Sequence, residues 1–482
     1  MKPFHVLNHC LSLTTIGRCR ALTIFAIAGT CATSLPTAPG AGFYLGDAAE
    51  DARRIGNAGA GWAAIADDPD TVYFNPAGMT RLTEPESSFS LTTIFLDIRF
   101  HNTGSTTAGL FPTSGDNAGN VGAPGEPVLG RLASSSFVTL PVTTVFGKPL
   151  FAGIGINSPF GLETNYSPDS VARYHATNSR LLTLNINPAL ALRVNNWLSL
   201  GVGFDAEYAE AALSRIIDFG LAGFALGIPG FSPGNKDRSV RSFGNDIGYG
   251  WNTGILLEPT SRTRAGLSYR SNVEFELEGT AKFHSVPAPF NQVFFNQGIK
   301  ADLNLPAIFS ASVYQELNDE FAVVGDITWT EWSSFDKVQI DFSSGVTPPS
   351  VQPERYKDVF RYSAGLIYTT PNRKFTLRTG YAYDESPIRN ATLRTPGVPD
   401  SNRNIIGVGF TFRPKDNIDL NVGCSHVFFA DSTTNNDDGA GHLLRGHYNA
   451  SANLVSVGYT YYFGGAKHLV SPTRETDKSY SK

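Results

Sequence analysis

The sequence predicts an all-β fold, a 14-stranded antiparallel transmembrane β-barrel with an N-terminal hatch, or plug, in its lumen. Three observations lead to this prediction. Residues 87–463 return repeatedly to stretches in which apolar and polar side chains alternate, which is the period of a β-strand. The connections between these stretches are alternately short and long. A segment rich in Gly and Ala, residues 41–86, precedes the first strand and does not alternate.

Residues 1–40 have the pattern of a secretory signal peptide. Lys2, Arg18 and Arg20 are basic, residues 21–28 are apolar, and small residues precede Ala41. We therefore expect the mature chain to begin at Ala41. A transmembrane anchor is the alternative, but it would need an apolar run of about 20 residues.

Residues 41–86 form the predicted hatch. Gly and Ala crowd residues 56–61, and an acidic turn follows at residues 67–70. This spacing of Gly and Pro suits neither a long helix nor a strand. The segment closes on Asn75, Pro76 and Ala77, a sequence that predicts a rigid turn. We expect this turn to anchor the hatch to the barrel wall without touching substrate.

Residues 87–463 form the predicted barrel. The clearest strands are residues 181–194, 197–208, 375–384 and 455–463, and tilted membrane-spanning strands need about 9–11 residues. A soluble sandwich alternates in the same way, so the loop lengths favour the barrel. Six short turns and seven long loops join 14 strands, which puts both termini on the short-turn side. In outer-membrane barrels that side is the periplasm.

Composition supports a membrane barrel and disfavours other classes. Charged residues make up 17% and aromatic residues 12% of the chain, and aromatic girdles are typical of such barrels. The net charge of −5 disfavours a nucleic-acid partner. Three of the four Cys lie in the leader, which leaves only Cys424, so no disulfide or Cys-based metal site is expected. Lipid modification of Cys31 is disfavoured by Thr30 before it. We expect no cofactor and no metal.

Short motifs recur in order along nearly the whole mature chain, and each alone would be weak. They are Ala41-Gly42-Phe43, Gly56-Asn57-Ala58-Gly59-Ala60, Asn75-Pro76-Ala77-Gly78-Met79, Asn157-Ser158-Pro159-Phe160-Gly161-Leu162, Ala172-Arg173-Tyr174, Asn187-Pro188-Ala189, Tyr269-Arg270-Ser271, Trp329-Thr330-Glu331-Trp332, Gly380-Tyr381-Ala382-Tyr383-Asp384 and Pro399-Asp400-Ser401-Asn402-Arg403. Together with 14 strands, they resemble the FadL/TodX outer-membrane transporters of long-chain fatty acids and aromatic hydrocarbons.

The C-terminus departs from that resemblance. Such barrels commonly stop at a terminal aromatic residue, which here would be Phe463, but residues 464–482 follow it and are largely polar. We expect these residues to form a disordered periplasmic tail.

The resemblance implies that a bound ligand shifts the hatch and that the substrate leaves sideways through a gap in the wall. Residues 151–157 form the third strand, and Ser158, Pro159, Phe160 and Gly161 interrupt it. Pro cannot donate a ladder hydrogen bond and Gly weakens pairing. Unpaired groups are costly in lipid, so the break should open onto protein or a cavity. The alternative is an ordinary bulge near the rim.

The connection after the fifth strand is unusually apolar for an outward loop. Residues 216–231 contain a single charge, and exposed apolar patches usually mark binding. We therefore predict a hydrophobic landing groove in which Phe219, Leu221, Phe224 and Leu226 contact the ligand. A loop that packs on its neighbours is the alternative.

Four further residues are candidate ligand contacts. The resemblance implies that the N-terminal segment reaches a lumen pocket, which would bring Phe43 and Tyr44 to the ligand; a frayed end is the alternative. Arg215 and Arg403 lie at the outer end of the fifth and the head of the twelfth strand, and a guanidinium suits a carboxylate. Pairing with Asp or Glu of the wall is the alternative for both.

These features predict a passive outer-membrane uptake channel for hydrophobic small molecules, above all long-chain fatty acids. An aromatic hydrocarbon channel of the same family is the alternative. The expected partners are the ligand, outer-membrane lipid and the barrel-assembly machinery, and we expect a monomer. An enzyme is disfavoured because no nucleophile elbow occurs. A general porin is disfavoured because it should have an open, charged constriction instead of a hatch.

Overall fold

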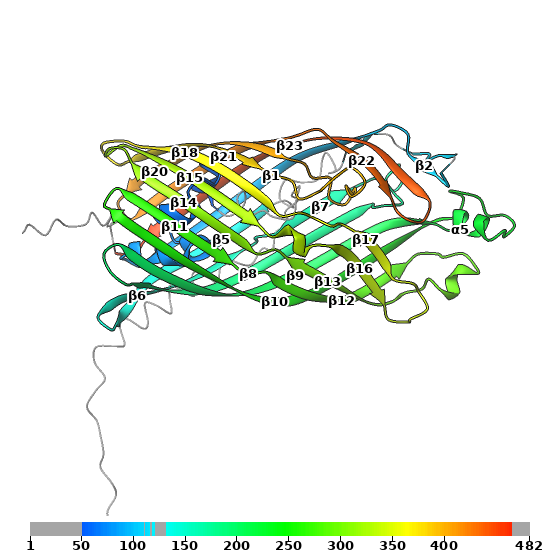
Figure 1. Cartoon of the computed structure of the whole chain (residues 1–482), viewed down its shortest axis with the longest axis horizontal. Coiled ribbons are helices and arrows are strands. Elements are labelled where there is room, and N and C mark those ends of the chain that lie inside the picture. Colours follow the sequence, from blue (N-terminus) through cyan, green and yellow to red (C-terminus); the bar gives the residue numbers. More distant parts are fainter. Residues whose placement is uncertain (1–50, 110, 116–117, 121–131, 465–482) are drawn as a thin grey trace, which may run out of the picture. The chain divides into compact units, whose positions relative to one another are not determined.

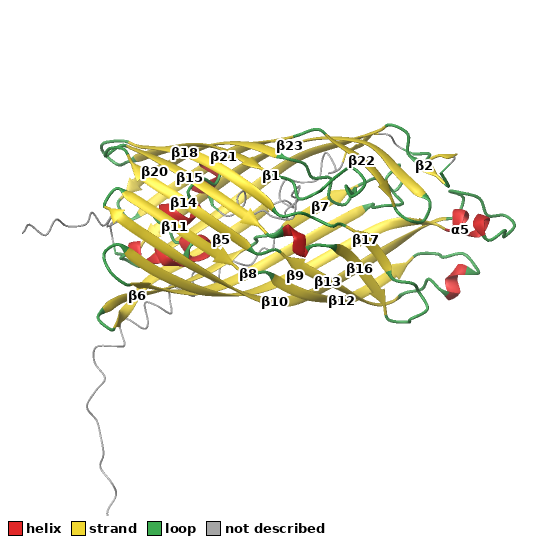
Figure 2. Ribbon diagram, in the orientation of Figure 1, coloured by secondary structure: helices red, strands yellow, loops and turns green. Residues whose placement is uncertain are grey.

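The computed structural model describes residues 51–109, 111–115, 118–120 and 132–464. Fourteen wall strands run antiparallel and close into a barrel (Figures 1 and 2). The barrel closes where β1 (Glu86–Asn102) pairs with β23 (His442–Tyr462), from Glu86 opposite Tyr462 to Asn102 opposite Gly446. The structure therefore confirms the predicted 14-stranded antiparallel β-barrel.

Eight wall strands are single elements, and six are interrupted. The remaining single strands are β5 (Leu132–Val145), β8 (Asn178–Arg193), β9 (Leu198–Asp218), β10 (Asp237–Thr260), β19 (Phe375–Asp384) and β20 (Arg403–Lys415). The interrupted strands are β6 (Lys148–Asn157) with β7 (Gly161–Asn165), β11 (Thr263–Arg270) with β12 (Val273–Phe283), β14 (Ile308–Glu316) with β13 (Gln297–Leu305), β15 (Phe321–Thr330) with β16 (Lys337–Phe342), β18 (Val359–Thr369) with β17 (Ser350–Pro353), and β21 (Ile418–Phe429) with β22 (Ser432–Asp437).

The barrel has two unlike ends, which we call the turn end and the loop end. Short connections such as residues 146–147 and 416–417 mark the turn end. The loop end carries the long connections, with the helix α5 (Phe219–Ala225) and the single turn η3 (Phe290–Gln292) at its tip (Figure 1). The first loop contains the short strands β2 (Thr106–Thr107), β3 (Phe111–Pro112) and β4 (Ala118–Asn120), and η4 (Trp332–Ser334) lies between β15 and β16.

The two faces of the wall have opposite polarity. On β23, Val455 and Val457 face outward and are 39% and 51% exposed, whereas Ser456 and Thr460 face the lumen and are fully buried. An apolar outer face and a polar lumen are what a barrel in lipid requires. Among the described residues, no helix has the length and hydropathy needed to cross a membrane.

Residues 51–82, which we call the hatch segment, lie within the turn end of the barrel (Figure 1, blue). The segment contains α2 (Ala52–Gly56), α3 (Trp62–Ile65), α4 (Thr71–Phe74) and the 3₁₀ helix η1 (Pro76–Arg81). Nearly all of its residues are buried, and it contacts wall strands on all sides, among them β8, β10, β14, β20 and β21.

Wall glycines allow this close approach. A side-chain carbon added at Gly254 would overlap Asn75 Oδ1, and one added at Gly201 would overlap the backbone of Ala77. The same holds for the glycines that face other parts of the hatch backbone, which are Gly266, Gly380, Gly407, Gly409 and Gly423. The hatch backbone therefore packs directly on the wall backbone, which only glycine permits at these positions.

Candidate functional site

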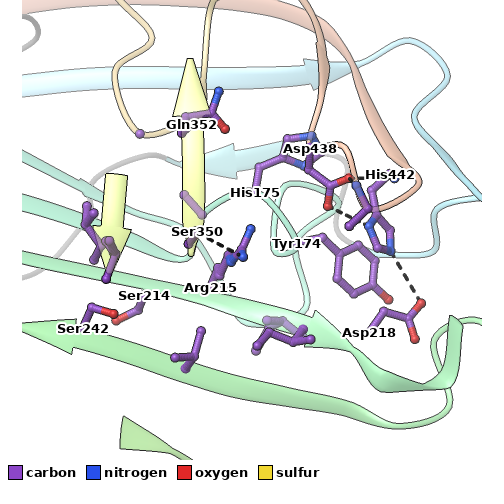
Figure 3. A pocket seen from close by; sticks show the side chains of 18 of the residues that line it. Tyr174, His175, Ser214, Arg215, Asp218, Ser242, Ser350, Gln352, Asp438 and His442 are labelled. Carbon is purple, nitrogen blue, oxygen red and sulfur yellow. Dashed lines mark hydrogen bonds and ion pairs between the residues drawn. The ribbon is translucent and has the colours of Figure 1, made fainter. Parts of the chain in front are cut away.

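A cavity of about 560 Å³ lies at the loop end (Figure 3). Its volume falls within the range of about 300–1,000 Å³ that is typical of ligand sites. Apolar side chains dominate the lining, among them Leu213, Leu221, Phe294 and Ile340. The lining comes from segments far apart in the sequence: the loop after β7, the end of β9, α5, β16, β17 and the turn between β22 and β23.

The helix α5 has two different faces. Leu221, Ala222 and Ala225 line the cavity, whereas Phe224 and Leu226 are 55% and 69% exposed. The sequence predicted a loop here, but β9 continues to Asp218 and the helix starts directly after it. Asp218 Oδ1 accepts a hydrogen bond from Leu221 N at 2.8 Å, so Asp218 is the N-cap that makes a helix of this Gly-rich stretch.

Phe219 does not line the cavity. Its side chain is 1% exposed, and its ring lies 5.3 Å from the ring of Phe290 and 5.4 Å from that of Phe294. Phe219 therefore joins α5 to the loop that carries η3. Its predicted contact with ligand stays a prediction.

Arg215 lies on β9 and lines the cavity. Its Nη2 donates a hydrogen bond to Ser350 Oγ at 3.4 Å, and no carboxylate of the described residues lies within 4.0 Å of it. Burial lowers the pKa of its guanidinium, but an arginine stays charged in proteins. The cavity thus holds a half-buried cation that no described carboxylate contacts directly, although the charge of Asp438 acts on it.

The other predicted contacts lie elsewhere. Arg403 pairs with Asp384 at 2.8 Å and lies 3.8 Å from Asp400, which is the pairing that the sequence left open as its alternative. Phe43 and Tyr44 fall outside the described residues. Of the predicted ligand contacts, the structure brings Arg215 and Leu221 together in the cavity.

A histidine between two carboxylates closes the rim of the cavity (Figure 3). His442 Nδ1 lies 2.8 Å from Asp438 Oδ2, and Nε2 lies 3.5 Å from Asp218 Oδ2. The ring stacks on Tyr174 with a centroid distance of 3.9 Å. These four side chains join the loop after β7, the start of α5 and the turn before β23, and we call them the rim cluster.

The imidazole of His442 carries a positive charge at neutral pH. Burial opposes the charge on His442, but Asp218 and Asp438 outweigh it and raise the pKa of this histidine to about 9. Burial likewise opposes the charge on Asp438, but His442 outweighs it and lowers the pKa of that carboxyl. Burial lowers the pKa of the neighbouring His175, which therefore stays neutral.

A smaller apolar pocket of about 90 Å³ lies deeper in the barrel. It shares Leu213, Val338 and Ile340 with the outer cavity and is also lined by Leu162 and Leu303. Apolar lining therefore continues from the loop end toward the interrupted third strand.

The interruption of the third strand adds one residue to the wall. Asn157 faces Asn185 and Gly161 faces Leu182 on β8, so four steps along the third strand oppose three along β8. The hydroxyl of Thr183 contacts the break at Phe160: its Oγ1 accepts a hydrogen bond from Phe160 N at 3.0 Å and donates one to Phe160 O at 2.9 Å. Among the described residues, β7 pairs with β8 alone. The extra residue is the bulge that the sequence left open as its alternative. On the side of β7 away from β8, no strand of the described residues pairs with it.

Asn75 joins the hatch segment to the wall. Its Nδ2 donates to Ala63 O at 2.6 Å within the hatch and to Ile255 O at 3.1 Å on β10. Its Oδ1 accepts from Ala77 N at 3.1 Å and so begins η1 at Pro76. This is the position predicted for an anchor, and the anchoring role itself stays a prediction.

Sequence reasoning did not single out the rim cluster as a site. Tyr174 appeared only within a family-like motif, and Asp438 and His442 carried no local signal. Asp438 lies four residues from His442, but His442 is more than 200 residues from Asp218 and Tyr174 in the chain, so only the closed barrel brings these side chains together.

The comparisons with known proteins agree with this architecture. A family described as outer membrane protein transport protein (OMPP1/FadL/TodX) matches residues 29–463. The chain belongs to this family. This FadL/TodX family member is therefore an outer-membrane transport protein and not an enzyme.

Individual relatives of this family member cover most of its length. The long-chain fatty acid transport protein of Escherichia coli O6:H1 (strain CFT073) is 30% identical over 411 residues, which is 80% of this chain and 86% of that protein. Outer membrane protein P1 of Haemophilus influenzae is 28% identical over 400 residues, covering 77% and 83% of the two chains.

Solved structures share the fold of this family member. A Pseudomonas aeruginosa FadL homologue matches with a TM-score of 0.76 and 22% identity, covering 88% of this chain and 100% of that one. The Ralstonia pickettii toluene transporter TbuX matches with a TM-score of 0.65 and 19% identity, covering 87% and 99%.

Proposed function

We propose that this outer-membrane protein is a passive uptake channel for hydrophobic small molecules, and that its substrates are long-chain fatty acids. The ligand would bind first in the loop-end cavity, which is apolar and has the volume of a ligand site. The exposed Phe224 and Leu226 on the outer face of α5 would make the first contact.

The observation that carries the choice of substrate is Arg215. A half-buried guanidinium that no described carboxylate contacts directly is stabilised when a ligand supplies the anion, although Asp218, Glu354 and Asp438 line other parts of the same cavity. A fatty acid brings an alkyl chain for the apolar lining and a carboxylate for the guanidinium, in the geometry that arginine prefers. An aromatic hydrocarbon would leave Arg215 without a partner.

The proposed route continues inward through the smaller pocket and then sideways. Leu162 lines that pocket and lies on β7, directly after the break at Ser158–Gly161. The hatch would move on ligand binding, and the ligand would leave at the break into the membrane. The interruption of the ladder supports this exit.

A titration of the purified protein with oleate and with toluene tests the substrate. We expect oleate to bind, and Arg215→Gln to weaken oleate by about tenfold, since a charge-assisted hydrogen bond contributes about 1.5–3 kcal/mol. Toluene binding should be unchanged by the substitution. Tight binding of toluene together with an Arg215→Gln variant that binds oleate normally would favour the aromatic hydrocarbon alternative, which the toluene transporter TbuX raises.

A further inference from the structure

The outer wall carries two like charges side by side near the loop end. Arg241 on β10 lies directly opposite Lys282 on β12. Both side chains are exposed, whereas the residues before and after each of them in the chain are buried, so both cations point away from the lumen. We call Arg241 and Lys282 the cation pair.

No carboxylate of the described residues neutralises the cation pair. Neither side chain forms an ion pair or a hydrogen bond with a described residue. Their neighbours on the same face are not acidic either; they are Ser214, Ser239, Phe243, Thr280 and His284. Like charges directly opposite each other in a sheet are destabilising, so the packing of the wall does not account for this pair.

A third cation on the same wall shows how an acidic neighbour is used. Lys300 on β13 has its Nζ 2.5 Å from Glu276 Oε1 and 2.7 Å from Glu278 Oε1. Both glutamates lie on β12, the strand that also carries Lys282. The carboxylates of this part of the wall are therefore engaged by Lys300, and the cation pair is left for a partner outside the chain.

The outer face of β10 shows where the cation pair lies relative to the lipid. Ile247, Tyr249, Trp251 and Ile255 face outward and are 54%, 64%, 49% and 36% exposed. With its end at Leu257, this apolar stretch covers about 25 Å of a tilted strand, which is the height of the lipid-facing band of a barrel. Arg241 lies beyond Ile247 toward the loop end, about 15 Å outside the band by the same geometry. The cation pair is therefore level with the head groups of the outer leaflet.

The chemistry of the cation pair suits a phosphate group. The guanidinium of Arg241 can bind two phosphate oxygens at once, and the ammonium of Lys282 adds a compact charge. Residues directly opposite each other have Cβ atoms about 4.5–5.5 Å apart, so both side chains can reach one phosphate. Ser239 Oγ and His284 Nδ1, which lie 3.3 Å apart, place further polar groups next to the pair.

We propose that Arg241 and Lys282 bind a phosphate group of the glycolipid in the outer leaflet, lipopolysaccharide, and so attach the barrel wall to the surrounding membrane. Free phosphate has the same chemistry, but the pair faces the leaflet at the level where lipid phosphates are concentrated. Neither residue lines the loop-end cavity. The proposal therefore does not depend on which molecule the channel carries.

Arg241→Gln combined with Lys282→Gln tests this site. The matched control is Arg262→Gln combined with Arg373→Gln, which removes two exposed cations at the turn end. The measurement is the affinity of the purified proteins in detergent micelles for lipopolysaccharide, for the same lipid after removal of its phosphates, and for inorganic phosphate. We expect the double variant to bind lipopolysaccharide about tenfold or more weakly, the loss of a charge-assisted contact. The control should bind it normally, and the parent should bind the dephosphorylated lipid as weakly as the double variant binds the intact lipid.

Three results would overturn the proposal. The first is equal affinity of the parent and the double variant for lipopolysaccharide, and the second is equal affinity of the parent for the intact and the dephosphorylated lipid. The third is inorganic phosphate that binds the parent as tightly as lipopolysaccharide, which would assign the pair to the free ion. Melting without lipid separates a structural role: the double variant should melt no lower than the parent because it removes like charges, and a lower melting temperature would contradict the proposal.

Oleate uptake by the double variant should be unchanged, because the cation pair lies outside the lumen. Loss of lipopolysaccharide binding with normal oleate uptake would support the site. A parent protein that takes up no oleate would refute the proposed function and leave the glycolipid site standing.

Discussion

The two ends of the lumen differ in how they are filled. At the turn end, wall side chains grip the hatch backbone: Arg264 Nε donates to Ala64 O at 3.1 Å and Arg270 Nη2 donates to Tyr73 O at 2.7 Å. At the loop end, the lumen is apolar and hollow, with cavities of about 560 and 90 Å³. A hydrophobic molecule that enters the hollow end therefore meets a tightly packed segment at the other end.

The third strand connects these two regions. Gly155 faces the hatch residue Val72, the break follows at Ser158–Gly161, and Leu162 lines the inner pocket. The hydrogen-bond ladder of the third strand is thus interrupted at the level where the hollow part of the lumen meets the part filled by the hatch segment. The proposed sideways exit therefore lies beside the hatch segment, at the boundary between these two regions.

Deleting residues 41–82 should have the largest effect, because it would remove the difference between the filled turn end and the hollow loop end. Without the hatch the turn end loses its stopper, so the barrel should conduct small solutes that the parent excludes. The measurement is single-channel conductance in planar lipid bilayers. A parent protein that conducts as well as the deletion variant would mean that the hatch seals nothing and would favour a general porin.

Substituting a wall glycine should disturb the packing of the hatch segment on the wall with a smaller effect than the deletion. Gly254→Ala forces a methyl group onto Asn75, so we expect a loss of about 1–3 kcal/mol in the free energy of unfolding, as for other overpacked sites. Gly325→Ala is the matched control, since its nearest neighbour would be an ordinary contact at 3.6 Å from Val313. Equal stabilities of the two variants, measured by urea unfolding in detergent micelles, would contradict the close packing of the hatch.

The two faces of α5 allow a sharper test of the hollow end. Leu221→Asp places a carboxylate in the cavity and should weaken oleate binding by about tenfold or more, because burying an unpaired charge is costly. Phe224→Asp alters the exposed face of the same helix and should leave equilibrium affinity nearly unchanged while slowing association. Equal losses of affinity would mean that the helix does not separate a cavity face from a capture face.

The rim cluster should give the smallest effect, through pH. The pKa of His442 is raised from its ordinary 6.5 to about 9, so its ion pairs stabilise the rim fully below about pH 6.5 and are lost as the pH rises through about 9. Loss of these ion pairs should lower the free energy of local opening at residues 438–442 by about 1–3 kcal/mol. We therefore expect their amide hydrogen exchange above pH 9 to rise faster than the intrinsic base-catalysed rate.

His442→Gln should exchange faster at neutral pH and lack this alkaline transition. His447→Gln, on the same strand but paired with His101 on β1, is the matched control and should keep it. A transition that survives in His442→Gln would belong to another group.

The barrel could be predicted from the sequence because strand periodicity and loop length are local signals. The hatch position was equally accessible, since Asn75-Pro76-Ala77 is a compact turn motif. The helix α5 was missed because it is only seven residues long and two of them are Gly, although Asp218 is a recognisable N-cap. The rim cluster could not be foreseen, since only the closed barrel brings Tyr174, Asp218 and His442 together.

The most direct test of the sideways route is to repair the third strand. Replacing Pro159, Phe160 and Gly161 with Thr, Val and Thr should extend pairing with β8 across the break, with the one extra residue held as a bulge, while the barrel still folds, as judged by heat-modifiable migration in gels. We expect uptake of radiolabelled oleate by cells to fall to the background of cells without the protein, with binding to the loop-end cavity retained. Unchanged uptake in a folded, repaired barrel would contradict exit through the wall.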